Sequence, residues 1–319
     1  MTELLKGHEL GFYSEKLTPA TATLAKDSEI VSVFINSQVR QEALDSLPNL
    51  KLIQTRSTGY DHIDVAYAKS KNILVASVPG YGARTVAEFA FALMLTLSRK
   101  IFGARHQMLE GDSFEISTFK GFELCGKTLG VVGTGRIGRN VIKIAKGFEM
   151  KVLAFDVFPD ANLAKEMGFE YVELQTLLSG SDIVTLHAPY NEKSHHLINH
   201  DNIGQMKKHA YLINTARGEL VETDALVRAL ERGDLAGAGL DVLEGERQLK
   251  EEAELFRAGK EFADYKTLFA DHVLMGMKNV VLTPHIAFDT VEGTREILET
   301  TAKIIASFAS GTPENILHQ

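Results

Sequence analysis

The feature that most constrains this chain is a repeated alternation of short apolar runs with helix-compatible stretches. The apolar runs are rich in Val, Ile and Leu, and many of them end at a glycine, a proline or a polar residue. Strands that alternate with helices form parallel sheets whose two faces are both covered. The runs cover residues 29–36, 50–55, 73–78, 129–132, 151–156, 182–187, 210–214, 237–241 and 280–283. The pattern predicts an α/β protein.

The length predicts two domains. A chain of 319 residues exceeds the size at which one hydrophobic core usually keeps growing. The strand count from residue 129 onward is that of a doubly wound, Rossmann-type domain. We expect one domain over 85–286, and another, discontinuous domain over 1–84 plus 287–319, to which the last helix returns. Helices are predicted at 41–47, 63–69, 136–146, 223–232 and 294–310, and a charged surface helix at 250–266.

A further helix is expected to start near Thr85. Thr85 and Glu88 have the spacing of a capping box. In this motif the threonine side chain binds the free backbone amide of the glutamate, and the glutamate side chain binds that of the threonine. The stretch 89–97 that follows is apolar almost all round, so we expect it to be buried between layers or between subunits. A simple core helix is an equally good interpretation.

Charge and cysteine content limit the possible partners. The net charge is −8 and the isoelectric point is about 5.8, which argues against nucleic acid or an anionic membrane as the main partner. No apolar run reaches the roughly 20 residues of a membrane span. The single cysteine, Cys125, cannot form an internal disulfide and fits a reducing compartment, so we expect a cytoplasmic protein.

A glycine-rich motif predicts a dinucleotide site. Gly133, Gly135 and Gly138, with Arg136 and Ile137 between them, directly follow one predicted strand and open a predicted helix. The first glycine permits a tight turn, the second lets the backbone approach a pyrophosphate, and the third allows close packing of helix on strand.

The next strand supports the same site. It ends at Asp156, near the spacing of about 20 residues expected for the acid that binds the ribose hydroxyls. A carboxylate there repels a 2′-phosphate, so we expect NAD rather than NADP.

Three residues far apart in the sequence suit the reduction of a 2-oxo acid. The planar guanidinium of Arg217 matches a carboxylate and polarises the ketone, and the imidazole of His285 can protonate a developing alkoxide. A carboxylate beside the histidine would favour and orient its protonated form. Glu246 fits that role better than Glu244 by its spacing from Asp241, which itself ends a predicted strand and could also serve only to cap it.

The chain resembles the D-2-hydroxyacid dehydrogenase family, and within it the D-lactate dehydrogenase group. The resemblance extends from about Ile30 onward, in the motifs at 57–64, 78–81, 86–88, 133–138, 187–189, 214–218, 240–246 and 283–285. It implies that Arg217 binds substrate, that His285 is the acid/base and that Glu246 is its carboxylate partner. It also implies a Rossmann-type NAD-binding domain, a flavodoxin-like substrate domain and a homodimer.

The resemblance assigns further residues to ligands. Asp241 would contact the nicotinamide amide, and His187, Ala188, Pro189, Thr215 and Ala216 would line the cofactor. The backbone around Thr58 and Gly59 would hold the substrate carboxylate. Tyr81 and Phe288 match positions where lactate-type members carry aromatic groups near the substrate, although packing in the core explains them equally well. A small pocket lined by aromatic groups would favour a short substrate, so pyruvate is the favoured one.

Other functions stay open at this point. A relative acting on larger 2-oxo acids, glyoxylate or hydroxypyruvate would carry the same residues, and an NAD-sensing corepressor-like binding protein would share the fold. His195, His196 and His200 lie in a polar stretch without supporting cysteines, so we expect a solvated surface and no metal site.

The N-terminal residues depart from the family pattern. Members open with a strand that lies centrally in the first sheet, whereas residues 1–7 look like the end of the helix after it and residues 8–13 like the second strand. A missing central strand leaves backbone groups of both neighbours unpaired. We expect a shortened, altered substrate domain, and a sheet with residues 1–7 as its central strand would contradict this.

Overall fold

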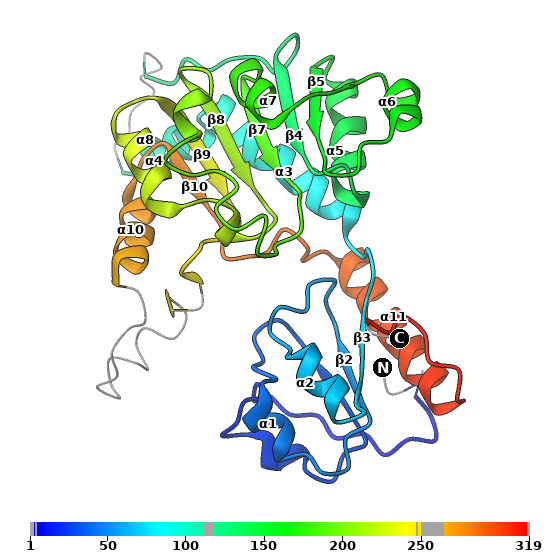
Figure 1. The fold of residues 1–319 in the computed structure, drawn as a ribbon. Helices are drawn as coiled ribbons and strands as arrows, with labels where there is room; N and C mark the ends of the chain where they lie inside the picture. The colour runs from blue at the N-terminus through cyan, green and yellow to red at the C-terminus, as the bar shows by residue number, and fades with distance from the viewer. Residues whose placement is uncertain (1–2, 4, 111–117, 247, 250–264, 318–319) are drawn as a thin grey trace. The chain divides into compact units, whose positions relative to one another are not determined.

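The chain folds into two compact units, each built on its own parallel sheet (Figure 1). The structure is a computed structural model that describes residues 3, 5–110, 118–246, 248–249 and 265–317. The first unit comprises Met1–Gly82 and Asp289–Gln319, and the second comprises Ala83–Phe288. The predicted α/β class is therefore confirmed. None of the described helices is long and apolar enough to cross a membrane.

The second unit contains a seven-stranded sheet. Its strands run in the order β10-β9-β8-β7-β4-β5-β6, and every neighbouring pair is parallel. They are β4 (Thr128–Val132), β5 (Lys151–Phe155), β6 (Glu170–Tyr171), β7 (Ile183–Leu186), β8 (Ala210–Asn214), β9 (Leu235–Leu240) and β10 (Val280–Leu282). The order reverses between β4 and β7, as in a Rossmann domain, and ligands of such sheets bind outside the carboxyl ends of the strands at this point.

Helices cover both faces of this sheet (Figure 1). One face packs against α3 (Ala83–Ser98) and α5 (Arg136–Gly147), and the other against α7 (Leu174–Gly180), α8 (Thr223–Glu231) and α10 (Tyr265–Gly276). Consecutive strand residues point to opposite faces. Ile183 therefore packs in the core on the side of α3 and α5, and Val184 packs in the core on the side of α7, α8 and α10. This explains why the strands are apolar without alternation.

The start of helix α3 differs from the prediction. Helix α3 begins at Ala83, so Thr85 lies inside its first turn and the predicted capping box is wrong. Its apolar side chains are buried within the unit, in the cluster that also contains residues of α5 and β4. The predicted surface helix at 250–266 lies almost wholly outside the described residues. The unit also contains the helices α4 (Ile101–Glu110) and α6 (Ala161–Met167) and the 3-10 helices η2 (Ile203–Gln205) and η3 (Gly218–Leu220).

The first unit contains a three-stranded sheet with the order β1 (Ile30–Val33), β2 (Leu52–Thr55) and β3 (Leu74–Ser77), all parallel. Its helices are α1 (Gln41–Asp45), α2 (Val65–Ser70) and α11 (Val291–Ala309), so the predicted helices are present with small shifts at their ends. The strands of a flavodoxin-like sheet lie in the order 2-1-3-4-5. The order β1-β2-β3 matches the part of that sheet formed by strands 3, 4 and 5.

The predicted strand at residues 8–13 is wrong. These residues have no strand structure, and Phe12 and Tyr13 are exposed. A strand is stable only where a neighbour accepts its backbone hydrogen bonds, and no described segment pairs with this one. The described residues among 1–7 are turns rather than a central strand. Leu5 instead packs against Ala302 and Ile305 of α11.

Candidate active site

The glycine-rich turn after β4 fits a pyrophosphate. Gly133 has a φ of +93°, and a Cβ there would lie 2.8 Å from backbone atoms of His187 and Ala188. A Cβ on Gly138 would lie 2.0 Å from the carbonyl oxygen of Gly133. Around Gly135, by contrast, no heavy atom lies within 4 Å of a Cβ, and no side chain caps α5 at this residue. Arg136 and Ile137 form the first turn of α5, whose amides favour an anion.

Asp156, just beyond β5, is held next to this turn. Its Oδ2 accepts hydrogen bonds from the amide and the hydroxyl of Thr134, at 2.6 and 2.8 Å, and its Oδ1 accepts one from the amide of Phe158 at 3.0 Å. Partial burial raises the pKa of Asp156, but these hydrogen bonds outweigh it and the pKa lies below its usual value. A charged carboxylate is therefore fixed beside the glycine turn, as expected for a residue that would bind ribose hydroxyls.

Two buried polar atoms lie in residues expected to line the cofactor. His187 is 9% exposed, its Nε2 bonds the Thr185 hydroxyl at 2.9 Å, and burial lowers its pKa to about 3, so the ring is neutral. His187 Nδ1 and Thr215 Oγ1 have no hydrogen-bond partner among the described residues. Buried polar atoms are normally satisfied, and a bound ligand can supply the partner. Ala188 and Pro189 follow His187 in the same segment.

The turn that carries Arg217 follows β8 and is clamped by Asn214. The Asn214 side chain accepts a hydrogen bond from the Ala216 amide at 3.0 Å and donates one to the Arg217 carbonyl at 2.8 Å. Gly218 then passes so close to the next segment that a Cβ would lie 2.0 Å from the carbonyl carbon of Leu243. The turn of Arg217 is thus packed directly against the segment that leads to Glu246.

His285 and Glu246 form a hydrogen-bonded pair. His285 Nδ1 lies 3.0 Å from Glu246 Oε1 and 3.1 Å from Oε2, and both side chains are largely buried. The backbone of His285 has a φ of +58°, a conformation that residues other than glycine adopt rarely. Since Nδ1 faces the carboxylate, Nε2 is the ring nitrogen that remains for proton exchange with a substrate.

Asp241 holds residues on both sides of His285. This 1% exposed carboxylate accepts hydrogen bonds from the Thr283 hydroxyl at 2.6 Å and from the amides of Ile286 and Ala287 at 2.9 and 2.8 Å. Burial raises the pKa of Asp241, although these hydrogen bonds and the nearby His285 act in the opposite direction. These hydrogen bonds tie the end of β9 to the turn after β10 and hold the left-handed conformation of His285 in place.

One positioning contact has no signal in the sequence. Asp271 of α10 is fully buried and its Oδ2 accepts a hydrogen bond from the amide of Gly245 at 2.9 Å. Gly245 lies between Glu244 and Glu246, so Asp271 holds the segment that presents Glu246. A single aspartate within a helical stretch does not reveal a partner 26 residues away.

The expected substrate residues of the first unit lie in the turns after β2 and β3. The Thr58 hydroxyl donates to the Val78 carbonyl at 3.0 Å and accepts from the Gly80 amide at 3.2 Å. Gly59 follows directly, and its carbonyl accepts a hydrogen bond from the Ser57 hydroxyl at 2.6 Å. Tyr81 packs against the apolar cluster that contains Val78.

Phe288 belongs to the second unit and lies close to His285. Its ring centroid is 6.4 Å from that of His285, and the two rings meet edge to face. Phe288 is thus placed beside the expected acid/base within one unit.

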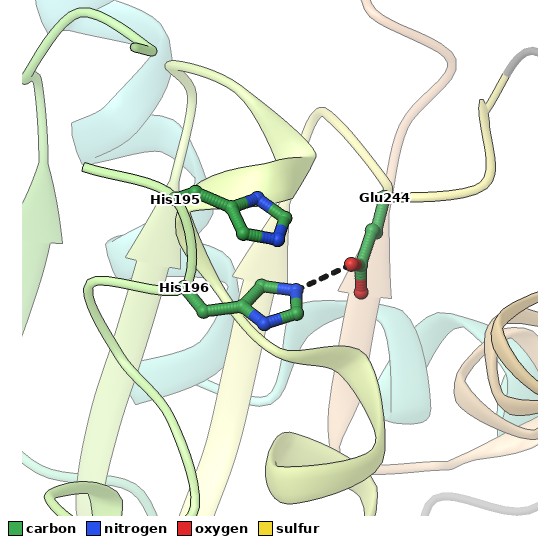
Figure 2. A group of neighbouring side chains, drawn as sticks. All are labelled: His195, His196 and Glu244. Carbon is green, nitrogen blue, oxygen red and sulfur yellow. Dashed lines mark hydrogen bonds and ion pairs between the residues drawn. The ribbon is translucent and has the colours of Figure 1, made fainter. Parts of the chain in front are cut away.

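The histidines expected on a solvated surface are only partly so. His195 is exposed, but His196 is half-buried and its Nε2 lies 2.5 Å from Glu244 Oε1 (Figure 2). His200 Nε2 lies 3.0 Å from Asp224 Oδ2. The expectation of a merely solvated stretch is therefore wrong for His196, because Glu244, distant in sequence, folds against it.

Comparison with known proteins agrees with these features. Residues 91–287 match the family model described as D-isomer specific 2-hydroxyacid dehydrogenase, NAD binding domain. The chain is 37% identical over 309 residues to the D-lactate dehydrogenase of Escherichia coli, covering 96% of this chain and 91% of the relative. It is 35% identical over 324 residues to the glyoxylate reductase of Thermococcus litoralis, covering 98% and 92%.

A solved structure agrees over the whole chain. The D-lactate dehydrogenase of Aquifex aeolicus, complexed with NAD and lactic acid, has a TM-score of 0.90 at 39% identity and covers 100% of this chain and 95% of its own. The present chain therefore belongs to the D-isomer-specific 2-hydroxyacid dehydrogenase family, and it is an oxidoreductase that uses NAD.

Proposed function

We propose that this enzyme reduces pyruvate to D-lactate with NADH, and catalyses the reverse reaction. The observation that carries the proposal is the pair of His285 Nδ1 and Glu246 Oε1, 3.0 Å apart, on a turn anchored by Asp241. Pyruvate is favoured because relatives named D-lactate dehydrogenase match nearly the whole chain. The glyoxylate reductase of Thermococcus litoralis is similar at almost the same identity, so glyoxylate is the first alternative substrate.

The proposed chemistry divides between cofactor and protein. NADH, when bound, supplies the hydride that reduces C2 of the 2-oxo acid. Arg217 binds the substrate carboxylate and draws electron density towards the ketone oxygen, as a guanidinium can do with its two parallel N–H groups. As the C=O bond becomes a C–O single bond, His285 donates the proton on Nε2 to the oxygen. Glu246 holds the ring by Nδ1 and so orients Nε2 for the transfer.

Binding roles are assigned to the remaining residues on the same basis. We assign Gly133, Gly135, Gly138, Asp156, His187 and Thr215 to the cofactor, with support from the open glycine turn and the two unpartnered buried atoms. Arg136, Ile137, Ala188, Pro189, Ala216 and Asp241 are assigned to it by the family resemblance. Thr58, Gly59, Tyr81 and Phe288 are assigned to the substrate, and the first unit is proposed as the substrate domain.

A homodimer in the cytoplasm is proposed as the working state. The apolarity of α3, which suggested a dimer from sequence, is accounted for by packing within the unit. Helix α4 offers a better surface, because Ile101, Phe102 and Leu109 are 48%, 54% and 67% exposed. Cys125, the single and exposed cysteine, fits a reducing compartment.

The test is NADH oxidation with a panel of 2-oxo acids, comparing the protein with His285→Gln. We expect turnover on pyruvate, a D-lactate product by chiral chromatography, and little activity with NADPH. Loss of a general acid typically lowers kcat by about 10²–10⁴-fold, and His285→Gln should fall in this range while still binding NADH. Turnover on glyoxylate alone would replace the substrate, and full activity in His285→Gln would refute the mechanism.

A further inference from the structure

Three potential metal ligands come together outside the catalytic pair. His195 and His196 lie in the segment after β7, and Glu244 lies in the segment after β9. Parallel strands end at the same edge of a sheet, which explains how residues 48 apart in sequence meet. One ligand atom from each of the three residues lies within 4.8 Å of the others (Figure 2).

Two of the three ligands are already held in place. Glu244 Oε2 accepts hydrogen bonds from the amide and hydroxyl of Thr223, at 3.1 and 2.9 Å, which leaves Oε1 directed at His196. The His196 amide donates to the Glu219 carbonyl at 2.8 Å, and its carbonyl accepts from the Asn199 side chain at 2.9 Å. These bonds fix the carboxylate of Glu244 and the backbone of His196, and partners that orient a ligand strengthen a metal site.

His195 is the adjustable ligand. Its ring stacks on that of His196, with centroids 3.8 Å apart and planes 23° apart, and it meets Tyr190 edge to face at 6.0 Å. An ion lies in the plane of each imidazole that binds it, so the stacked arrangement must open for both rings to coordinate. Because His195 is exposed, rotation of its side chain meets little resistance.

The donor set selects the kind of ion. Two imidazole nitrogens and one carboxylate oxygen are a recurrent ligand set for Zn²⁺, with bonds of about 2.0–2.2 Å and a fourth position for water. Ligand atoms around a tetrahedral ion of this size lie roughly 3.3 Å apart. The His196–Glu244 distance of 2.5 Å must therefore widen by less than about 1 Å.

We propose that His195, His196 and Glu244 form a zinc-binding site on the second unit. The ion cross-links the segment that contains His187, Ala188 and Pro189 to the segment that contains Glu246. An ion that binds the folded arrangement in preference to the unfolded chain also stabilises the unit.

The test is a zinc titration against a chromophoric chelator in a Cys125→Ser background, which removes the exposed thiol as a competing ligand. We expect one Zn²⁺ per chain. His195→Ala should weaken binding at least roughly ten-fold, since even loss of a partner that only orients a ligand costs about 10–100-fold. Cobalt in place of zinc should give the strong visible absorption of a tetrahedral site, which His195→Ala should lose.

Matched variants identify the site. His200→Ala removes another carboxylate-paired histidine of the same segment, and His285→Gln removes the catalytic one; both should bind zinc with unchanged affinity. Glu244→Gln should weaken binding as His195→Ala does, and if it fails to fold, the exposed His195 decides alone. Unchanged affinity in His195→Ala, or a loss in His285→Gln or His200→Ala, would overturn the proposal.

Discussion

At the scale of single residues, the second unit keeps several polar groups in unusual environments in the turns that follow its strands. His285 has a left-handed backbone conformation, Asp241 is a buried carboxylate with three hydrogen bonds, and His187 is a buried neutral imidazole. Such arrangements cost free energy and persist only where the surrounding structure holds them. All three lie just after strands of the same parallel sheet, at the edge where ligands of such sheets bind.

The buried His187 predicts how stability depends on pH. Its pKa is about 3 in the folded protein and 6.5 in the unfolded chain. Below pH 6.5 the unfolded chain binds a proton that the folded protein does not, so this residue lowers the free energy of unfolding as the pH falls from 6.5 towards 3. The slope is about 1.4 kcal/mol per pH unit, or roughly 2 kcal/mol between pH 6.5 and 5.

Urea unfolding at a series of pH values, without cofactor, measures this effect. His187→Gln should show a shallower decline in stability below pH 6.5 than the unchanged protein, whatever its stability at pH 8. His8→Gln, which alters an exposed histidine, serves as the control and should keep the original slope. Equal slopes in the two variants would show that His187 is charged in the folded protein.

At the scale of elements, the turn of Arg217 approaches the segment before Glu246 so closely at Gly218 that an added methyl group would not fit. In Gly218→Ala the new Cβ would lie 2.0 Å from the Leu243 carbonyl carbon and 2.1 Å from its oxygen, so one backbone segment must move. We expect a loss of about 1–3 kcal/mol in stability. We also expect kcat/KM to fall by at least roughly ten-fold, because misplaced catalytic groups are costly.

Steady-state kinetics and urea unfolding together check this prediction. Gly204→Ala is the matched control, because no heavy atom lies within 4 Å of its added Cβ. It should keep full activity and a stability within about 0.5 kcal/mol of the original. If Gly218→Ala has the activity and stability of Gly204→Ala, the turn of Arg217 is not packed against Leu243 as described.

At the scale of the whole molecule, the proposed dimer depends on the exposed apolar face of α4. Replacing Phe102 and Leu109 together by Asp would bury two charges if this face is an interface, and charges buried without partners are strongly unfavourable. The double variant should therefore be a monomer that keeps its circular dichroism spectrum.

Light scattering after size-exclusion chromatography gives the mass directly. Phe269→Asp changes a side chain that is 71% exposed on α10, and as the control it should leave the dimer intact. A dimer that survives the double substitution in α4 would place the interface elsewhere, and a monomeric starting protein would remove the proposal altogether.

Much of the fold and of the candidate site follows from local sequence. Alternating strands and helices predicted the two parallel sheets, because the apolar runs must be covered on both faces. The glycine positions of 133–138 were interpretable because a tight turn and close helix packing exclude a Cβ at Gly133 and Gly138. The motifs of Arg217 and His285 were likewise identifiable one at a time.

The tertiary structure alone decided the contacts between segments distant in the chain. The partner of His285 was predicted from the spacing of Glu246, but the structure alone paired His196 with Glu244, which is separated from Glu246 by one residue. It also brought the buried Asp271 to Gly245 and left residues 8–13 without a strand partner. Sequence patterns report which way a residue faces within its own element, whereas these contacts depend on how loops from different strands pack at a shared sheet edge.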